Sequence, residues 1–491
     1  MPSHFHRLSK DVIIYGLGGI VLRLFSFVTL PIFTRIFSPA DYGIIETVGA
    51  VTSVIILFAT LGLDSASQRS YFDYRPDQQI ERRAVLSTTF WTLLGWSGGL
   101  AFLSVVVSGI FAPRLLGNPS YALLLGIAAV GMPVTVIGNF FRDILRLWHQ
   151  PVRYALFAIV DALLTVGWTL YLVAVLGWGL PGNYIGPLVG GLIALGIGYS
   201  LVHDAIHLAF NRRELRAMLA YGLPLVPVAV STWVLQLADR FFLLRYVSPS
   251  ELGLYGLGVR LSNLLLLGVT AFGVAWPPFM LELYNRDPLQ ERQVRARALT
   301  YVTFVLSLGA LCLSVFAREF FLTVTAPSFM NAYKVVGLLS GSIVVIGMNA
   351  VVMSGITLSR QTHYFARYTI LSALINVLFN FVLIPPLGMI GAALATLLSY
   401  VSLFCFYYRR AQMLSAALFD YRRLLAILVT AAGLVALGTF INLNPLWVSV
   451  AIKALLVLAF PLLVWLLRGL EPRELDYLRA LALKMGEKVL R

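Results

Sequence analysis

Long apolar stretches separated by short polar links follow one another along the whole 491-residue chain. Each stretch has about 20 residues or more, which at about 1.5 Å per helical residue is enough to cross the hydrocarbon core of a bilayer. The stretches cover residues 11–36, 42–63, 85–111, 120–141, 153–176, 183–206, 220–245, 252–280, 298–317, 333–357, 365–384, 389–408, 422–441 and 446–468. This pattern predicts an all-α, polytopic membrane protein with about 14 transmembrane helices.

The composition agrees with this pattern. Hydrophobic residues make up 59% of the chain and charged residues 12%, and the mean hydropathy is +0.85. The short polar links leave no room for a soluble catalytic domain of ordinary size, so the function must lie in or at the membrane. The first stretch is too long for the core of a signal peptide, and no small-residue cleavage site follows it, so we expect it to be retained as the first helix.

The positive charge of the chain, +15 in total, is concentrated in alternate links. The basic links carry Arg69, Arg75, Arg82, Arg83, Arg142, Arg146, Arg153, Arg212, Arg213, Arg216, Arg286, Arg292, Arg295, Arg297, Arg360, Arg367, Arg409, Arg410, Arg422 and Arg423. The opposite links carry only Arg35, Arg114, Arg245, Arg318 and Lys334. By the positive-inside rule we expect the basic links and both termini to be cytoplasmic, in a multi-pass protein of the inner (plasma) membrane. The basic balance thus reflects topology, and we expect no nucleic-acid partner.

The chain also resembles itself at an offset of 210 residues, because residues 38–44 (SPADYGI) match residues 248–254 (SPSELGL). Proline just inside a helix and an acid in its first turn favour helix initiation at both links. Three weaker echoes occur in the same order: residues 15–17 with 221–223, 119–121 with 327–329, and 153–154 with 367–368. Chance similarity among loops of limited composition is the alternative explanation.

An offset that carries helix 1 onto helix 7 gives both halves the same orientation in the membrane. Parallel repeats of this kind enclose a central site in known transporters. We therefore predict two six-helix lobes around a central cavity, with two extra C-terminal helices. The predicted parts are residues 1–210 for the N-terminal lobe, 211–418 for the C-terminal lobe, 419–468 for helices 13 and 14, and 469–491 for a cytoplasmic tail.

Arg23 lies near the middle of the first apolar stretch. An arginine at the centre of a bilayer costs about 2.5–3.5 kcal/mol on insertion scales, so such residues usually face a bundle interior or a watered cavity. Arg23 therefore predicts a cationic cavity, and a structural ion pair is the alternative.

Several short motifs are recognisable together with the fourteen spans and the repeat. They are residues 37–43 (FSPADYG), 238–241 (ADRF) at the end of helix 7 and 255–258 (YGLG) at the start of helix 8. The chain resembles the polysaccharide (Wzx-type) flippases of the multidrug/oligosaccharidyl-lipid/polysaccharide exporter superfamily. The resemblance implies alternating-access transfer of an undecaprenyl-diphosphate-linked oligosaccharide from the cytoplasmic to the periplasmic leaflet, for O-antigen or exopolysaccharide assembly.

A cavity for such a substrate must be cationic and able to form hydrogen bonds. Arginine suits a diphosphate because its planar fork makes paired, charge-assisted bonds to phosphate oxygens. The candidate substrate-binding residues are Arg23, Arg260, Arg240, Lys453, Asn263, Asn349, Asn376 and Asn380. The alternatives are snorkelling of Arg260 or Lys453 to an interface and interhelical contacts of the asparagines.

Three acids inside apolar stretches, Asp161, Asp239 and Glu46, are candidates for ion coupling or for ion pairs. The lipid II flippase is similar in placing cavity arginines on helices 1 and 8, but it also has one on helix 2, where this chain has Glu46. We expect no cofactor; Na+ or H+ could serve as a coupling ion. Pro277 and Pro278 could bend helix 8 during transport, although many membrane helices carry inert prolines.

Residues 471–491 place apolar side chains along one helical face with basic residues elsewhere, which predicts an amphipathic helix on anionic membrane lipids. A solvated tail is the alternative. A polysaccharide polymerase or chain-length complex is a possible protein partner.

Enzyme motifs are not recognisable in the sequence: we find no Walker A motif, metal-binding set or nucleophile with a base. We therefore expect a transporter and not an enzyme. Within transport, the alternatives are a cation-coupled multidrug exporter or a lipid II flippase of the same superfamily. From another class, a membrane-bound polysaccharide polymerase or ligase is the remote alternative.

Overall fold

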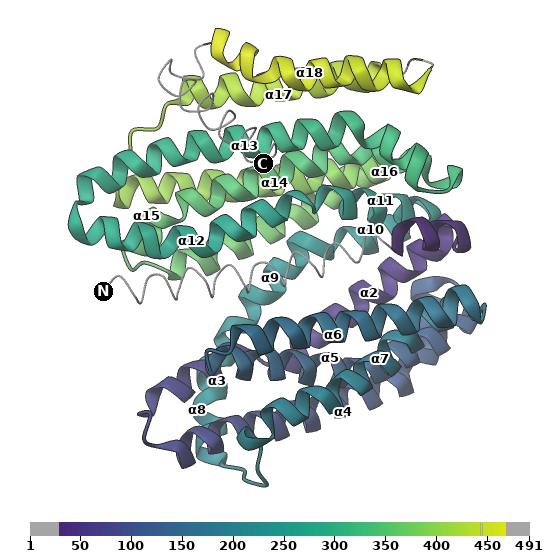
Figure 1. Ribbon diagram of the computed structural model, residues 1–491, viewed down its shortest axis with the longest axis vertical. Helices are drawn as coiled ribbons and strands as arrows, with labels where there is room; N and C mark the ends of the chain where they lie inside the picture. The colour runs from purple at the N-terminus through teal and green to yellow at the C-terminus, as the bar shows by residue number, and fades with distance from the viewer. Residues whose placement is uncertain (1–28, 442, 444, 468–491) are drawn as a thin grey trace, which may run out of the picture. The chain divides into compact units, whose positions relative to one another are not determined.

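The computed structural model describes residues 29–441, 443 and 445–467. Within these ranges the chain is almost entirely helical and forms no strand (Figure 1). Twelve helices of the described part are long and apolar enough to cross a membrane. The predicted all-α polytopic architecture is therefore confirmed, with the count of fourteen as an approximation. The first predicted span, residues 11–36, lies mostly outside the described residues.

The helices of the first half of the chain are α2 (Pro39–Thr60), α3 (Leu63–Asp73), α4 (Gln79–Leu116), α5 (Ala122–Leu147), α6 (Pro151–Leu170), α7 (Gly179–Val202), α8 (Arg212–Gly222), α9 (Val226–Leu237) and α10 (Asp239–Tyr246). Those of the second half are α11 (Pro249–Ser262), α12 (Leu265–Arg286), α13 (Pro288–Val324), α14 (Val336–Val352), α15 (Ser354–Leu358), α16 (His363–Leu414), α17 (Tyr421–Phe440) and α18 (Leu446–Leu466). Short turns join some of them: η1 (Pro119–Tyr121), η2 (Tyr171–Val175), η3 (His203–Ala205), η4 (Leu223–Leu225) and η5 (Pro327–Val335).

The described chain forms two compact units. The first contains the residues up to Leu257 together with Val324–Phe329 and Thr369–Ala395. The second contains Gly258–Thr323, Met330–Tyr368 and the described residues from Thr396 onward. The predicted repeat boundaries are defined by sequence similarity and stay a prediction.

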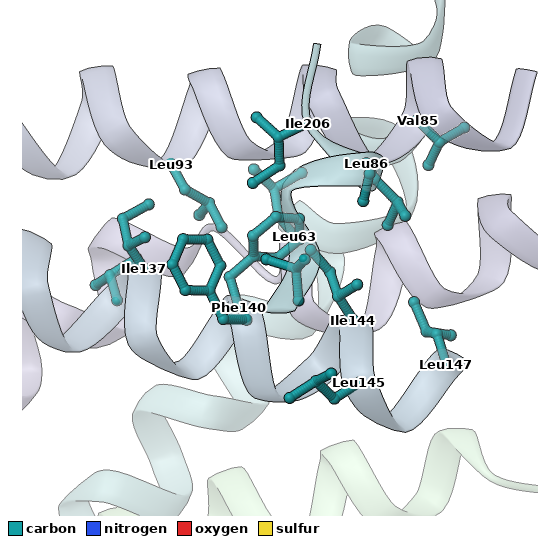
Figure 2. Packing of buried hydrophobic residues seen from close by; sticks show 14 of the residues in the cluster. Leu63, Val85, Leu86, Leu93, Ile137, Phe140, Ile144, Leu145, Leu147 and Ile206 are labelled. Atoms are coloured by element: carbon teal, nitrogen blue, oxygen red, sulfur yellow. The ribbon is translucent and has the colours of Figure 1, made fainter. Parts of the chain in front are cut away.

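The first unit is built on a helical bundle in which α5 contacts both α4 and α7, and α6 packs on α7 (Figure 1). One apolar cluster of this unit joins α3, α4, α5 and the residues that follow α7, with Leu63, Leu86, Phe140 and Ile144 almost fully buried (Figure 2). Fully burying a side chain of this size stabilises the fold by about 1.5–3 kcal/mol. This cluster holds one end of the bundle together.

The link between α3 and α4 is also tied to α8. The Tyr74 hydroxyl donates to Glu214 Oε1 at 2.6 Å. This hydrogen bond and burial raise the pKa of Tyr74 to about 12. The phenol therefore remains a proton donor at neutral pH.

In the second unit, the C-terminal pair α17 and α18 packs on α13. Phe304 and Val315 of α13 meet Ile427 of α17 and Phe460 of α18 in one buried apolar cluster. The rings of Phe304 and Phe460 stack with centroids 5.3 Å apart. The extra helix pair predicted from the sequence is thus packed directly on the helix that corresponds to predicted span 9.

The helix starts at residues 38–44 and 248–254 have the predicted chemistry. At the first, Ser38 Oγ accepts a hydrogen bond from Asp41 N at 3.2 Å, and Asp41 Oδ2 accepts one from Ser38 N at 2.9 Å, which is a complete capping box. At the second, Ser248 Oγ accepts from Glu251 N at 3.2 Å. The Glu251 carboxylate differs from that of Asp41, because it accepts a hydrogen bond from Met389 N, at 2.7 Å.

Met389 lies at a kink in α16. Gly388 has φ 56° and ψ −133°, a conformation that no helical residue adopts, so α16 consists of two helices that meet there. They correspond to the predicted spans 365–384 and 389–408. Glu251 Oε1 therefore caps the first turn of the second helix, where four backbone N–H groups would otherwise lack intrahelical partners.

In both units, the segment at or just after the end of a late predicted span, 183–206 in the first and 389–408 in the second, is hydrogen-bonded to an earlier helix. In the first, Ser87 Oγ of α4 donates to the Ala205 carbonyl at 3.1 Å and accepts from His207 N at 2.9 Å. In the second, Arg295 Nη2 of α13 donates to the carbonyl and the hydroxyl of Ser415 at 2.7 and 2.9 Å. These ties lie at nearly the offset that relates the two halves of the sequence.

Candidate functional site

A buried cluster of charges joins α2, α10 and α11 in the first unit. Arg240 and Asp239 are only 4% and 3% exposed. Arg240 Nη1 donates to Asp239 Oδ1 at 2.7 Å and to the Gln236 carbonyl at 2.6 Å. Arg240 Nε lies 3.7 Å from Glu46 Oε2, and the Tyr255 hydroxyl donates to the second oxygen of Asp239. One guanidinium is therefore shared between two carboxylates.

The sequence places each of these groups by helix geometry. Adjacent residues on a helix point about 100° apart, so Asp239 and Arg240 cannot face the same neighbour directly. The long side chain of Arg240 resolves this, because it reaches both Asp239 on its own helix and Glu46 on α2. Gly256 on α11 makes room for Glu46: a Cβ there would lie 2.6 Å from Glu46 Cγ. We call these four residues, Glu46, Asp239, Arg240 and Tyr255, the α2–α10–α11 cluster.

The asparagines predicted to bind substrate lie in different surroundings. In α16, the Asn380 amide donates to Asn376 Oδ1 at 2.9 Å, and both side chains are fully buried in the first unit. Asn349 of α14 is buried in the second unit, and neither its amide nitrogen nor its oxygen has a hydrogen-bond partner among the described residues. Asn263 is exposed. The structure thus brings together only Asn376 and Asn380.

The predicted cations are also distributed. Arg260 is half-buried in the last turn of α11 and takes part in interactions with other groups. Lys453 of α18 is 1% exposed, and its Nζ lies 2.6 Å from Glu319 Oε1 of α13. Ser449 Oγ donates to the same oxygen at 3.0 Å. Arg23 lies outside the described residues, as does the predicted amphipathic tail.

Of the two roles considered for Asp161, ion coupling and an ion pair, the structure shows an ion pair. Asp161 Oδ2 accepts from Arg142 Nη1 at 2.8 Å, between α6 and α5. The pair lines a cavity of about 100 Å³ in the first unit, which is also lined by residues of α7 such as Gly191. Arg142 also donates to Asn139 Oδ1. The basic residue that the charge pattern had placed in a cytoplasmic link therefore lies within α5.

The two prolines proposed as a hinge do not interrupt their helix, since α12 runs through Pro277 and Pro278. The nearby Trp276 donates to Ser354 Oγ at 2.7 Å and stacks on Phe272. The predicted span 252–280 is instead divided at Asn263 and Leu264, between α11 and α12. A hinge at the prolines stays a prediction.

Some buried charged residues could not be recognised as buried from the sequence, because they lie outside the predicted apolar stretches. Glu319 was predicted to lie in a link that follows residue 317, but α13 continues to Val324. In the sequence, Arg318 and Glu319 end the apolar stretch; in the structure, Glu319 is part of the helix and lies 2.6 Å from Lys453 Nζ. Arg295 and Glu291 likewise form a buried i,i+4 pair with Nε and Oε1 3.2 Å apart. Ion pairing between apolar stretches becomes visible only when the helices are packed.

Comparison with solved structures identifies the fold. The chain superimposes on the lipid II flippase MurJ in an inward-closed conformation with a TM-score of 0.72, 15% identity, and coverage of 91% of this chain and 98% of that one. An inward-facing multidrug resistance MATE family transporter of the MOP superfamily gives a TM-score of 0.65 at 15% identity, over 80% of this chain and 94% of that one. The chain therefore shares the fold of these two transporters.

The family follows from the sequence. A model described as polysaccharide biosynthesis protein matches residues 8–284, more than half of the chain, and the protein belongs to this family. The resemblance drawn from the sequence motifs is confirmed.

Three relatives with similar sequences are consistent with this family. The succinoglycan biosynthesis transport protein ExoT of Rhizobium meliloti is 25% identical over 64% of this chain and 62% of its own length, so the chain spans less than two thirds of that relative. The Lsg locus putative protein 1 of Haemophilus influenzae is 20% identical over 66% of this chain and 78% of its own length. The probable flippase AglR of Haloferax volcanii is 32% identical over 33% of this chain and 34% of its own length.

Proposed function

We propose that the protein is a flippase that moves an undecaprenyl-diphosphate-linked oligosaccharide from the cytoplasmic to the periplasmic leaflet of the inner membrane, for O-antigen or exopolysaccharide assembly. The observation that carries the proposal is membership of the polysaccharide biosynthesis family in a chain with a MOP-superfamily transporter fold. The transport and flippase names of two relatives support it. The protein itself catalyses no covalent step in this proposal.

Intramembrane charge supports the chemistry of the cargo. A diphosphate crossing hydrocarbon needs fixed cations and hydrogen-bond donors, since an unpaired charge in a medium of low dielectric constant is costly. Arg23 and Arg260 are the proposed diphosphate ligands, and Asn263, Asn349, Asn376 and Asn380 the proposed partners of sugar hydroxyls. Alternating access would expose this site first to one leaflet and then to the other.

The α2–α10–α11 cluster is the proposed site of ion coupling. It contains two carboxylates and one guanidinium, so it carries a formal charge of about −1 when both acids are ionised, and binding H+ or Na+ would neutralise it. Glu46 is the better candidate for exchange, because its contact with Arg240 is 3.7 Å whereas that of Asp239 is 2.7 Å. If transport is coupled to H+ or Na+ at this cluster, the Glu46→Gln variant of the protein should flip its substrate at a rate that no longer depends on pH or on Na+.

The experiment that tests the proposal uses the full-length protein in proteoliposomes with a fluorescent undecaprenyl-diphosphate-linked oligosaccharide. Arg23→Ala should abolish flipping and Arg23→Lys should restore it poorly. The control is Arg35→Ala, at an exposed arginine whose Nη1 donates to the Pro31 carbonyl. Full flipping by Arg23→Ala would reject the diphosphate role. Transport of lipid II or of cationic drugs, with no transport of the oligosaccharide lipid, would favour one of the two rival exporters.

A further inference from the structure

Two arginines that the proposed transport site does not use line one cavity in the first unit. Arg114 lies in the last turn of α4 and Arg245 in the last turn of α10. The cavity has a volume of about 440 Å³. Its remaining wall is formed by Leu115, Leu116, Gly117, Phe241, Leu244 and Pro249. Two guanidinium groups and an apolar wall are therefore brought together from segments far apart in the sequence.

Among the described residues, no acid pairs with either of these arginines. Within the part of the chain that the structure describes, neither Arg114 nor Arg245 has an ion pair, and no acid lines the cavity. The two acids nearest to Arg245 along the chain have other partners: Asp239 bonds to Arg240, and Glu251 accepts from Met389 N. The Arg245 guanidinium carbon lies 5.8 Å from the centre of the Tyr246 ring, which leaves its charge intact.

A simpler explanation covers each arginine separately. A cation in the last turn of a helix offsets the negative end of the helix dipole, an effect of about 0.3–1 kcal/mol. This effect does not require the two side chains to share a cavity. It also does not explain why the start of α11, the positive end of a fourteen-residue helix, borders the same cavity through Pro249. The two guanidinium groups and the start of α11 therefore converge on this space.

Their position along the chain makes the convergence informative. Only five basic residues occur in the links predicted to face the periplasm, and two of them are Arg114 and Arg245. Positive charge is scarce on that side because the positive-inside rule selects against it. Both arginines are exposed and lie in the last turns of their helices. The ends of membrane-spanning segments are expected to reach the headgroup region of a bilayer.

We propose that this cavity binds the phosphate group of a lipid in the outer leaflet of the membrane. Guanidinium groups make paired, charge-assisted hydrogen bonds to phosphate oxygens. The side chains of Leu115, Leu116, Phe241 and Leu244 offer an apolar surface to the first carbons of the lipid chain. The ligand chemistry is that of a phosphate on an apolar chain, supplied either by phosphatidylglycerol or by a polyprenyl diphosphate. The inference does not rest on the proposed function, because the cavity and its charges exist whatever the protein transports.

The test measures binding to the purified full-length protein in detergent by isothermal titration calorimetry. The probes are short-chain phosphatidylglycerol, short-chain phosphatidylcholine and farnesyl diphosphate. The variant Arg114→Gln/Arg245→Gln should bind the anionic probes at least tenfold more weakly than the wild type. The variant Arg114→Lys/Arg245→Lys should retain part of the affinity, since it keeps the charge but not the planar fork. Arg35→Gln, another exposed arginine of the same side, should bind like the wild type.

The source of the phosphate follows from the same titrations. If only phosphatidylglycerol loses affinity in the glutamine variant, the site holds a bulk lipid; if only farnesyl diphosphate does, it holds a polyprenyl carrier. Equal binding of every probe to the wild type and the glutamine variant would overturn the proposal. So would an equal loss in Arg35→Gln, which would indicate a general surface-charge effect. If the glutamine variant fails to fold, the wild type and the lysine variant still provide a test. Binding of the anionic probes by both proteins no tighter than their binding of phosphatidylcholine would overturn the proposal.

Discussion

Gly43 of α2 and Gly253 of α11 pack against each other in the first unit. A Cβ added to Gly253 would lie 3.0 Å from Gly43 N and would overlap the Pro39 carbonyl oxygen. A Cβ added to Gly43 would lie 2.6 Å from the Pro249 carbonyl carbon and closer still to its oxygen. The two residues occupy equivalent places in the two similar links, so each link uses its glycine to approach the proline of the other.

This reciprocal contact predicts that neither position accepts a side chain. Gly43→Ala and Gly253→Ala should each lower the free energy of unfolding by about 1–3 kcal/mol, because backbone atoms must move apart. The matched control is Gly49→Ala on α2, where a Cβ would meet nothing within 4 Å. Thermal unfolding in detergent should show a lower midpoint for the first two variants only. An unchanged midpoint in Gly43→Ala would contradict the packing described here.

The buried pair Lys453–Glu319 gives a second prediction. Lys453→Ala should destabilise the protein by about 3–5 kcal/mol, since it leaves the Glu319 carboxylate buried without its cation. The double variant Lys453→Met/Glu319→Leu should recover most of this loss, because an apolar pair of similar volume has no charge to desolvate. Lys334→Met, at an exposed lysine, is the control. Chemical or thermal unfolding measures all three, and a double variant as unstable as Lys453→Ala would refute the explanation.

The α2–α10–α11 cluster predicts unequal effects for its two acids. Asp239→Asn should cost about 3–5 kcal/mol, because Asp239 holds Arg240 at 2.7 Å and also accepts the Tyr255 hydroxyl. Glu46→Gln should cost about 1 kcal/mol, since Arg240 keeps its contact with Asp239. Unfolding midpoints in detergent compare the two. Equal losses of stability in the two variants would mean that Arg240 interacts equally with both acids, which would contradict the distances of 2.7 Å to Asp239 and 3.7 Å to Glu46.

The sequence predicts the fold well because its signals are local. A bilayer requires long apolar helices, so thirteen of the predicted spans can be followed among the described helices. The start of α2 is equally local, since a serine cap, a proline and an acid three residues from the cap specify it. The similarity of residues 38–44 and 248–254 also has a structural counterpart in the packing of Gly43 against Gly253.

The sequence does not predict where helices break or continue against their local signals. The break at Asn263 and Leu264 contains neither glycine nor proline, and α13 continues past Arg318 and Glu319 into what hydropathy presents as a link. Conversely, Pro277 and Pro278 lie inside an uninterrupted helix. Hydropathy contains no information about the contacts between helices, which can override local signals of this kind.

The candidate site shows the same limit. Intramembrane position alone singled out Asp161, Asp239, Glu46, Arg240 and Lys453 as unusual, and the structure gives each of them an oppositely charged neighbour. The identity of two of these neighbours, Arg142 and Glu319, could not be predicted because both were assigned to polar links. Pairing depends on the rotation of each helix about its axis, which a single sequence does not fix.

The bond between α18 and α13 has an evolutionary consequence. A shortened form of this chain that ended before residue 419 would leave the Glu319 carboxylate without Lys453 beside it, and an unpaired charge at a membrane helix is costly. Loss of the last two helices would therefore need a compensating change at position 319, and a natural twelve-helix homologue should carry a neutral residue there. Helices α17 and α18 are therefore required for the stability of the unit that contains α13.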